Sequence, residues 1–149
     1  IGNPKLLIVD EPTAGLDPAE RVRFLNLLSE LGENSVVLLS THIVEDVAVL
    51  CSNMAIIAGA QVVLQGTPAD LLAPFDDRIW TKLIQQSELE QCRANLDVVS
   101  THFKAGQMLI RVIAETCPGE GFEQSTPTLE DVYFTATRKV TKSELPNVA

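Results

Sequence analysis

Two segments of the chain place side chains capable of phosphate chemistry directly after short apolar runs. Asp10 and Glu11 follow the run Leu6–Val9, and the tripeptide STH at positions 40–42 follows the run Val36–Leu39. Carboxylates can hold Mg²⁺ near a phosphate and orient an attacking water, and an imidazole can donate to a terminal phosphate. The residue types therefore favour the attack of water on a phosphoryl group.

The two apolar runs are predicted to be neighbouring parallel strands. Between them, the sequence DPAE at positions 17–20 supplies a helix N-cap, a proline at the first helical position and an acidic residue. The helix is expected to end at Gly32, with a left-handed glycine cap. A strand, a helix and a strand at this spacing form a βαβ unit, whose strands are parallel. Because ligands bind outside the carboxyl ends of such strands, Asp10, Glu11 and His42 should converge on one edge.

The apolar pattern also predicts what these elements bury. The continuous apolar run Leu6–Val9 is typical of a strand that is buried on both faces. The helix after it repeats apolar residues at helical spacing, which predicts one buried stripe. The residues of that stripe are Val22, Phe24, Leu25, Leu27, Leu28 and Leu31.

The rest of the chain shows shorter periodic pieces, and we place a domain boundary near residues 74–77, between domains 1–74 and 75–149. The tail 145–149 is expected to be frayed. Further predicted elements are a helix Ile43–Cys51, a hairpin of Met54–Ala58 with Gln61–Leu64, a helix that starts at Thr67 and stops at Pro74, a strand Ile79–Ile84, a helix Ser87–Arg93, a hairpin of Val98–Phe103 with Met108–Ile113, and a last helix with Leu129, Val132, Tyr133 and Ala136 inward.

The amino-acid composition limits the classes of protein to which the chain can belong. A hydrophobic content of 46% with 21% charged residues is typical of a globular protein. The formal net charge of −9 argues against a nucleic-acid partner, since phosphate neutralisation needs clustered cations. No apolar run approaches the roughly 18 residues of a membrane span. Cys51, Cys92 and Cys117 are odd in number and lack C-x-x-C spacing, which indicates buried or free thiols in a reducing cytosol.

The stretch LLIVDEPTAGLDP, followed by STH, resembles the second half of an ATP-binding-cassette (ABC) ATPase. By this resemblance, Leu6–Asp10 corresponds to the Walker B strand and Asp10 to the carboxylate that holds Mg²⁺, through water. Glu11 falls at the catalytic glutamate, and His42 at the switch histidine that senses the terminal phosphate.

The sequence AGLD at positions 14–17 falls at the D-loop of that family, which contacts the opposite subunit of the nucleotide-sandwich dimer. The resemblance therefore implies that Gly15 and Asp17, with Asp10, lie at the ATP site. It implies an α/β fold, with a partial parallel sheet of P-loop type followed by a small α+β domain. The implied partners are a transmembrane permease and a second ATPase subunit arranged head to tail, at the cytoplasmic face of the cell membrane.

The family's phosphate-binding loop, glutamine loop and LSGGQ signature are absent from this sequence. It contains no Gly-Lys dipeptide, so it holds no G-x-x-x-x-G-K-[ST] loop to cradle the phosphates. Because those elements precede Walker B in the family and the first residue is Ile, we expect a fragment of a longer polypeptide. The fragment alone is expected to lack tight binding of ATP and Mg²⁺. It is also expected to self-associate through an exposed sheet edge.

Three functions stay open at this level. The first is the ATP-hydrolysing subunit of a transporter, and the match of TPTLEDVYFTAT to a carboxyl-terminal extension of exporters favours export. The second is a regulatory or dimerisation module centred on residues 75–142. The third is a non-transport ABC ATPase that acts on ribosomes or DNA. The AGLDP sequence and the excess of acidic over basic residues disfavour this third function.

Overall fold

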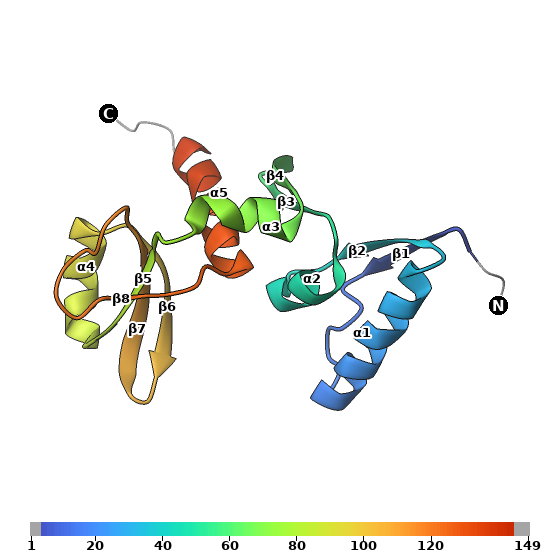
Figure 1. Cartoon of the computed structure of the whole chain (residues 1–149), viewed down its shortest axis with the longest axis horizontal. Helices are drawn as coiled ribbons and strands as arrows, with labels where there is room; N and C mark the ends of the chain where they lie inside the picture. The colour runs from blue at the N-terminus through green and yellow to red at the C-terminus, as the bar shows by residue number, and fades with distance from the viewer. Residues whose placement is uncertain (1–3, 145–149) are drawn as a thin grey trace. The chain divides into compact units, whose positions relative to one another are not determined.

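The computed structural model describes residues 4–144 of the chain, with side chains through residue 138, so the expected frayed tail lies outside the described residues. Helices and strands alternate from β1 to α2, and hairpins and further helices follow (Figure 1). The elements are β1 Leu6–Asp10, α1 Pro18–Gly32, β2 Val36–Ser40, α2 Val44–Leu50, β3 Met54–Ala58, β4 Gln61–Gly66, α3 Pro68–Leu72, β5 Ile79–Ile84, α4 Leu89–Asn95, β6 Val98–Lys104, β7 Gln107–Ile113, β8 Glu123–Gln124 and α5 Leu129–Glu144, with 3₁₀ turns at Ala73–Phe75 and Gln86–Glu88.

The chain forms two compact units, which divide between Ser52 and Asn53. The first unit holds β1, α1, β2 and α2, and the second holds the remaining elements. Among residues 4–144, no helix has both the length and the hydropathy that crossing a membrane requires.

The first unit is the βαβ arrangement that the sequence predicts. Strands β1 and β2 pair in parallel, with Leu6 opposite Val36 and Asp10 opposite Ser40. Asp17 caps α1 by accepting a hydrogen bond from the Glu20 amide at 2.8 Å, as expected. The expected left-handed cap at Gly32 is wrong. Helix α1 includes Gly32 and ends in right-handed backbone at the next residue, so that position needs no glycine geometry.

One face of the β1–β2 sheet is open, so the expectation that β1 is buried on both faces is wrong. Every second residue of each strand is exposed and the residues between them are only partly buried, with α1 packed against β2. The open face carries four apolar side chains, Leu6, Ile8, Val36 and Leu38, each 54–66% exposed. The predicted stripe on α1 is buried only at Leu28. Its neighbours Val22, Leu27 and Leu31 are exposed.

The second unit begins with the predicted hairpin of β3 and β4. Its two turn residues, Gly59 and Ala60, both have positive φ, which is the geometry of a tight type I′ hairpin turn. Helix α3 then starts at the predicted cap, where the Thr67 hydroxyl accepts a hydrogen bond from the Asp70 amide at 3.1 Å. Both the hairpin and α3 contact α5.

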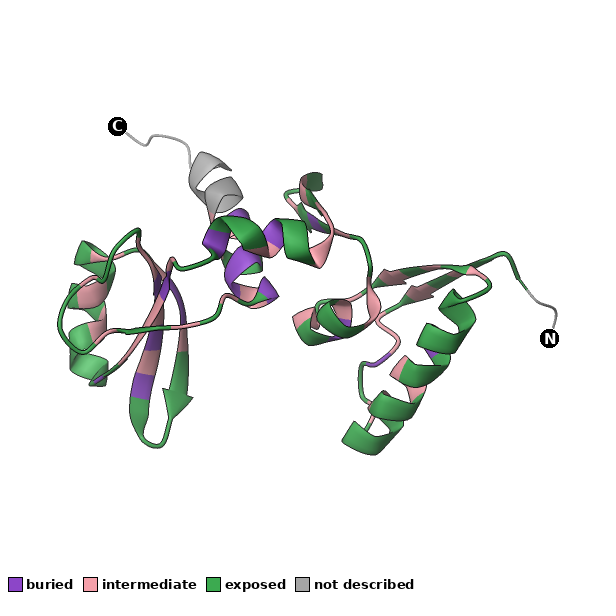
Figure 2. Ribbon diagram, viewed as in Figure 1, coloured by how far each residue is buried: buried purple, intermediate pink, exposed green. Residues whose placement is uncertain are grey.

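A four-stranded antiparallel sheet completes the second unit, in the order β6-β7-β5-β8. Helix α4 packs through Leu89 against one face of it, over the buried side chains Ile110 and Val112. Figure 2 shows that burial concentrates in this unit, on the sheet and on α5. Leu129, Val132 and Ala136 of α5 point inward as expected, whereas Tyr133 is 38% exposed, so its predicted inward position is wrong.

The division at Ser52 lies upstream of the domain boundary expected at residues 74–77. Residues 53–73 group with the second unit because α5 contacts the β3–β4 hairpin and α3 as well as β6. A single helix thus joins elements from both sides of the expected boundary, and residues 53–73 belong to the second compact unit.

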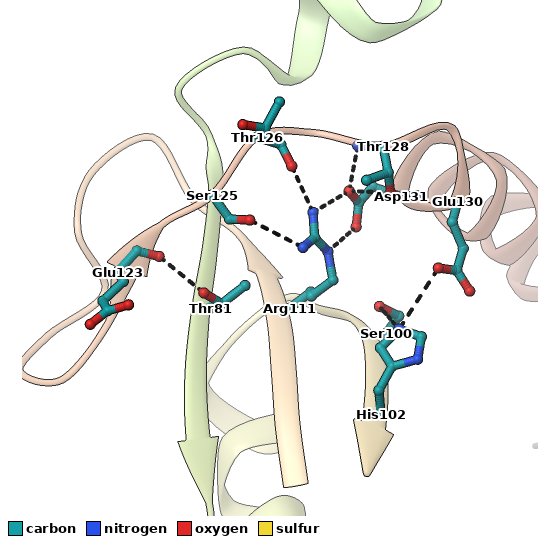
Figure 3. A network of polar contacts seen from close by, with 10 residues as sticks. All are labelled: Thr81, Ser100, His102, Arg111, Glu123, Ser125, Thr126, Thr128, Glu130 and Asp131. Carbon is teal, nitrogen blue, oxygen red and sulfur yellow. Dashed lines mark hydrogen bonds and ion pairs between the residues drawn. The ribbon is translucent and has the colours of Figure 1, made fainter. Parts of the chain in front are cut away.

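A buried ion pair fixes the start of α5 on the sheet (Figure 3). Arg111 of β7 meets both carboxylate oxygens of Asp131, at 2.8 and 2.7 Å. The same guanidinium donates to the Ser125 hydroxyl and to the Thr126 carbonyl. Asp131 also accepts hydrogen bonds from the amide and hydroxyl of Thr128, and its own amide donates to the Thr128 hydroxyl, so the two residues form a capping box with Thr128 as the N-cap of the helix.

Replacement of Asp131 by alanine is expected to destabilise the second unit by about 3–5 kcal/mol, because the largely buried Arg111 would lose its counter-ion. Urea denaturation of the chain, followed by circular dichroism, measures the change. Glu130→Ala is the matched control, since that side chain is partly exposed and should change stability by less than about 0.5 kcal/mol. Equal effects of the two substitutions would contradict the structural role of the pair.

Candidate functional site

The parallel register brings the polar ends of β1 and β2 level with each other. Asp10 lies opposite Ser40 in the ladder, and the Glu11 amide donates to the Ser40 carbonyl at 2.8 Å. The residues that follow each strand therefore leave the sheet side by side. This is the convergence on one edge that the sequence predicts.

Glu11 and His42 meet at that edge. The His42 Nδ1 atom lies 2.8 Å from Glu11 Oε2, and the Thr41 hydroxyl lies 3.4 Å from the same oxygen. The Glu11 side chain is 39% exposed and the His42 side chain 75% exposed. The pair is thus formed within the protein and remains accessible to water and to a ligand.

The backbone at Glu11 is in the left-handed region, with φ of 44°. A non-glycine residue in this region carries strain of about 1–3 kcal/mol, which the surrounding structure must hold in place. Strained backbone of this kind clusters at functional sites. The turn starts immediately after β1, where the Ala14 amide donates back to the Glu11 carbonyl at 3.2 Å.

Asp10 has a different partner, the Ser40 hydroxyl, which donates to Asp10 Oδ1. The side chain is exposed at the end of β1, so its carboxylate is accessible to a hard cation. Within the described residues, no group of three or more His, Cys, Asp or Glu side chains could hold a metal together. One accessible carboxylate fits Mg²⁺, which keeps several waters and takes further oxygens from substrate phosphates.

The loop at positions 14–17 leads from this edge into α1. Gly15 has φ of +79°, and a Cβ at that residue would meet no atom within 4 Å, so glycine is required for its backbone geometry rather than for space. The carboxylate of Asp17 is engaged as the helix cap. The structure therefore gives Gly15 and Asp17 a clear local role in starting α1, and their expected contact with nucleotide stays a prediction.

Sequence reasoning missed a buried cluster beside this edge. The Asp46 carboxylate accepts a hydrogen bond from the Thr13 hydroxyl at 2.6 Å and from Arg21 Nε at 2.9 Å. A signal was present, because Asp46 lies on the same helical face as the apolar residues Ile43 and Leu50. A carboxylate within an apolar stripe indicates a buried, paired charge.

The second unit holds another set of suggestive residue types, Ser100, His102 and Glu130 (Figure 3). The Ser100 hydroxyl lies 3.2 Å from His102 Nε2, and Glu130 Oε2 lies 3.8 Å from the same nitrogen. A hydrolytic triad needs the serine and the carboxylate on different ring nitrogens. This geometry therefore does not support a serine hydrolase.

Comparison with known proteins shows which proteins the chain is similar to. The Nod factor export ATP-binding protein I of Rhizobium meliloti is 30% identical to the chain, over 95% of the chain and 45% of that protein. The Bacillus subtilis protein YxlF, an uncharacterised ABC transporter ATP-binding protein, is 27% identical over 88% of the chain and 49% of that protein. The chain is a homologue of ABC transporter ATP-binding proteins. No protein-family model matches it.

The chain spans about half the length of these ABC relatives. A solved structure described as the ATP-binding subunit of an ABC transporter aligns with 49% of the chain and 31% of its own chain, at 34% identity and a TM-score of 0.45. The resemblance to ABC ATP-binding proteins that the Walker B and switch-histidine motifs indicate is thus confirmed by the curated relatives, which cover nearly the whole chain.

The cysteines of the ABC homologue differ in their expected reactivity. Burial, and then the charge of Asp46, raise the pKa of the Cys51 thiol above its ordinary value, whereas Cys117 is exposed. A raised pKa lowers the thiolate fraction at a given pH, and the thiolate is the reactive form. Cys51 should therefore react with iodoacetamide more slowly than Cys117 at about pH 8, and its rate should keep rising to higher pH.

Peptide mass spectrometry after timed alkylation of the folded chain measures both rates. The same experiment in denaturant is the control, because unfolding removes the burial and brings the two rates together. Equal rates in the folded chain would show that Cys51 is not protected.

Proposed function

We propose that the chain forms the hydrolytic part of the ATP site in an ABC transporter ATPase. The observation that carries the proposal is the contact of Glu11 with His42 at the ends of two parallel strands, in a homologue of ABC ATP-binding proteins. Glu11 is the group that orients and deprotonates the attacking water. His42 holds that carboxylate through Nδ1, and its other ring nitrogen is available to the terminal phosphate.

Asp10 completes this part of the site. Its exposed carboxylate, oriented by the Ser40 hydroxyl, would hold Mg²⁺ through water. The bound Mg²⁺ supplies charge neutralisation on the phosphates. Asp10 and Glu11 are adjacent in sequence, but their carboxylates have separate partners, Ser40 and His42. The two carboxylates can therefore act separately, one on the metal and one on water.

The remainder of the function is inferred from the relatives. Several are ATP-binding proteins of Nod factor export, so we propose that the intact ATPase energises export by a transmembrane partner at the cytoplasmic membrane face. Its two subunits would join head to tail across ATP. Because the ATPase does not itself bind the transported molecule in this arrangement, the substrate would be selected by the transmembrane partner.

The 149-residue chain by itself is expected to bind Mg-ATP no more tightly than about millimolar. It has no Gly-Lys dipeptide, and a phosphate-binding loop contributes several charge-assisted hydrogen bonds of about 1.5–3 kcal/mol each. Isothermal titration of the chain with Mg-ATP measures the affinity. A micromolar dissociation constant would show that the chain holds a nucleotide site of its own.

In the intact ATPase, Glu11→Gln is expected to reduce turnover by about 100-fold or more while ATP still binds, because the amide cannot accept the proton of water. Phosphate release under saturating Mg-ATP measures turnover, and equilibrium binding of ATP measures affinity. Glu45→Gln is the matched control, since Glu45 is exposed on α2. Near wild-type turnover in Glu11→Gln would remove Glu11 from the role of general base.

A further inference from the structure

The interior of the first unit contains an unusual share of polar groups. In the part of this unit that the structure describes, three residues are buried, and two of them are Thr13 and Asp46. The third is Leu28 of α1. Figure 2 shows how little of this unit is coloured as buried. Apolar packing alone therefore does little to fix the position of the loop after β1 relative to α2.

The buried carboxylate of Asp46 is fully partnered. Asp46 is 2% exposed, and its two oxygens divide between two partners. Oδ2 accepts the Thr13 hydroxyl at 2.6 Å, whereas Oδ1 meets Arg21 Nε at 2.9 Å and Arg21 Nη2 at 2.7 Å. Burial of a charge is costly unless it is paired and hydrogen-bonded, so this geometry is strongly preferred over displaced ones.

These contacts join the three segments that carry the proposed site. Thr13 is two residues after Glu11, and Asp46 is four residues after His42. Arg21 lies one turn into α1, and its amide donates to the carbonyl of the cap residue Asp17 at 2.8 Å. One carboxylate thus ties the glutamate loop and the start of α1 to the helix that follows the histidine.

The contact between Thr13 and Asp46 can hold the strained backbone at Glu11 in its conformation. A residue with φ of 44° stays in that conformation only where its surroundings hold it. Thr13 lies within the turn that runs from Glu11 to Ala14, and it starts the next turn, since the Leu16 amide donates to the Thr13 carbonyl at 3.2 Å. The hydroxyl of the same Thr13 is anchored to Asp46. Release of that anchor would let the turn relax and move the Glu11 carboxylate relative to His42.

We propose that Asp46 is a positioning residue that holds Glu11 and His42 in contact, by fixing the loop at Thr13 and the helix at Arg21 to α2. The proposal deepens the proposed ATPase function and rests on it for its catalytic consequence. Asp46 itself does not touch Glu11 or His42 in any of its described contacts. Its effect is transmitted through the backbone of the two segments.

A double-mutant cycle on the 149-residue chain tests the proposal without nucleotide. The cycle uses Glu11→Gln and His42→Gln, and urea denaturation at low ionic strength gives the coupling energy between the two side chains. The same cycle is then repeated in the presence of Asp46→Asn. We expect the coupling to be lost, whereas a merely stabilising role would lower overall stability and leave the coupling intact.

Glu45→Gln is the matched control for the cycle. It removes one negative charge from the neighbouring exposed position of α2, so it reproduces the change in net charge without touching the buried contacts. The coupling between Glu11 and His42 should survive this substitution. Persistence of the coupling with Asp46→Asn, or its equal loss with Glu45→Gln, would overturn the proposal.

Thr13→Val provides a second test if Asp46→Asn does not fold. It removes one hydrogen bond and preserves both the side-chain shape and the Arg21–Asp46 pair. We expect the ¹⁵N chemical shift of His42 Nδ1 to move toward its value in Glu11→Gln, because contact with the carboxylate weakens. An unchanged Nδ1 shift in Thr13→Val, alongside a clear change in Glu11→Gln, would overturn the proposal.

A catalytic measurement separates this proposal from the function on which it rests. In the intact ATPase, Asp46→Asn should lower kcat by about 100-fold with little change in KM, because misplaced groups slow chemistry without weakening nucleotide binding. A wild-type kcat in this variant would overturn the positioning role. Absence of hydrolysis in the unmodified protein would instead overturn the proposed function, and the coupling measured without nucleotide would still decide the role of Asp46.

Discussion

The parallel pairing of β1 with β2 is the constraint on which the first unit depends. In an antiparallel pair, the residues after the two strands would leave opposite ends of the sheet. In the parallel ladder, with Asp10 opposite Ser40, both chains leave the same edge. Glu11 and His42 are 31 positions apart in the sequence and meet there at 2.8 Å. The crossover helix α1 makes this pairing possible, because a parallel connection needs about a dozen residues or more.

The two units are stabilised by different physical means. The second is organised around apolar side chains that are almost fully buried, such as Ile110 and Val132, together with a buried ion pair at the start of α5. The first has one buried apolar residue among those described and relies on directional polar contacts at Asp46. Apolar packing has no directional requirement, whereas the hydrogen bonds that the Asp46 carboxylate accepts from threonine and arginine have a preferred geometry. The directional polar contacts at Asp46 therefore lie in the same unit as the proposed catalytic residues.

Local signals in the sequence predict much of this structure. The N-caps at Asp17 and Thr67, the two hairpins and the parallel strands are where the patterns place them, because caps, prolines and turn residues act over a few positions. The exposure of Leu6 and Ile8 could not be predicted in this way, since it depends on which elements cover the sheet. The convergence of Glu11 and His42 follows from strand topology, whereas the partners of Asp46 come from three separate segments that no local pattern relates.

The left-handed backbone at Glu11 has a consequence for how this protein can be improved. Glycine adopts positive φ without steric cost, so a stability screen at this position would favour its replacement. The best-folding variant would then lack the very carboxylate that meets His42. Selection for thermostability and selection for the proposed hydrolysis would therefore oppose each other at one residue, and a library built to stabilise the first unit should leave that residue unchanged.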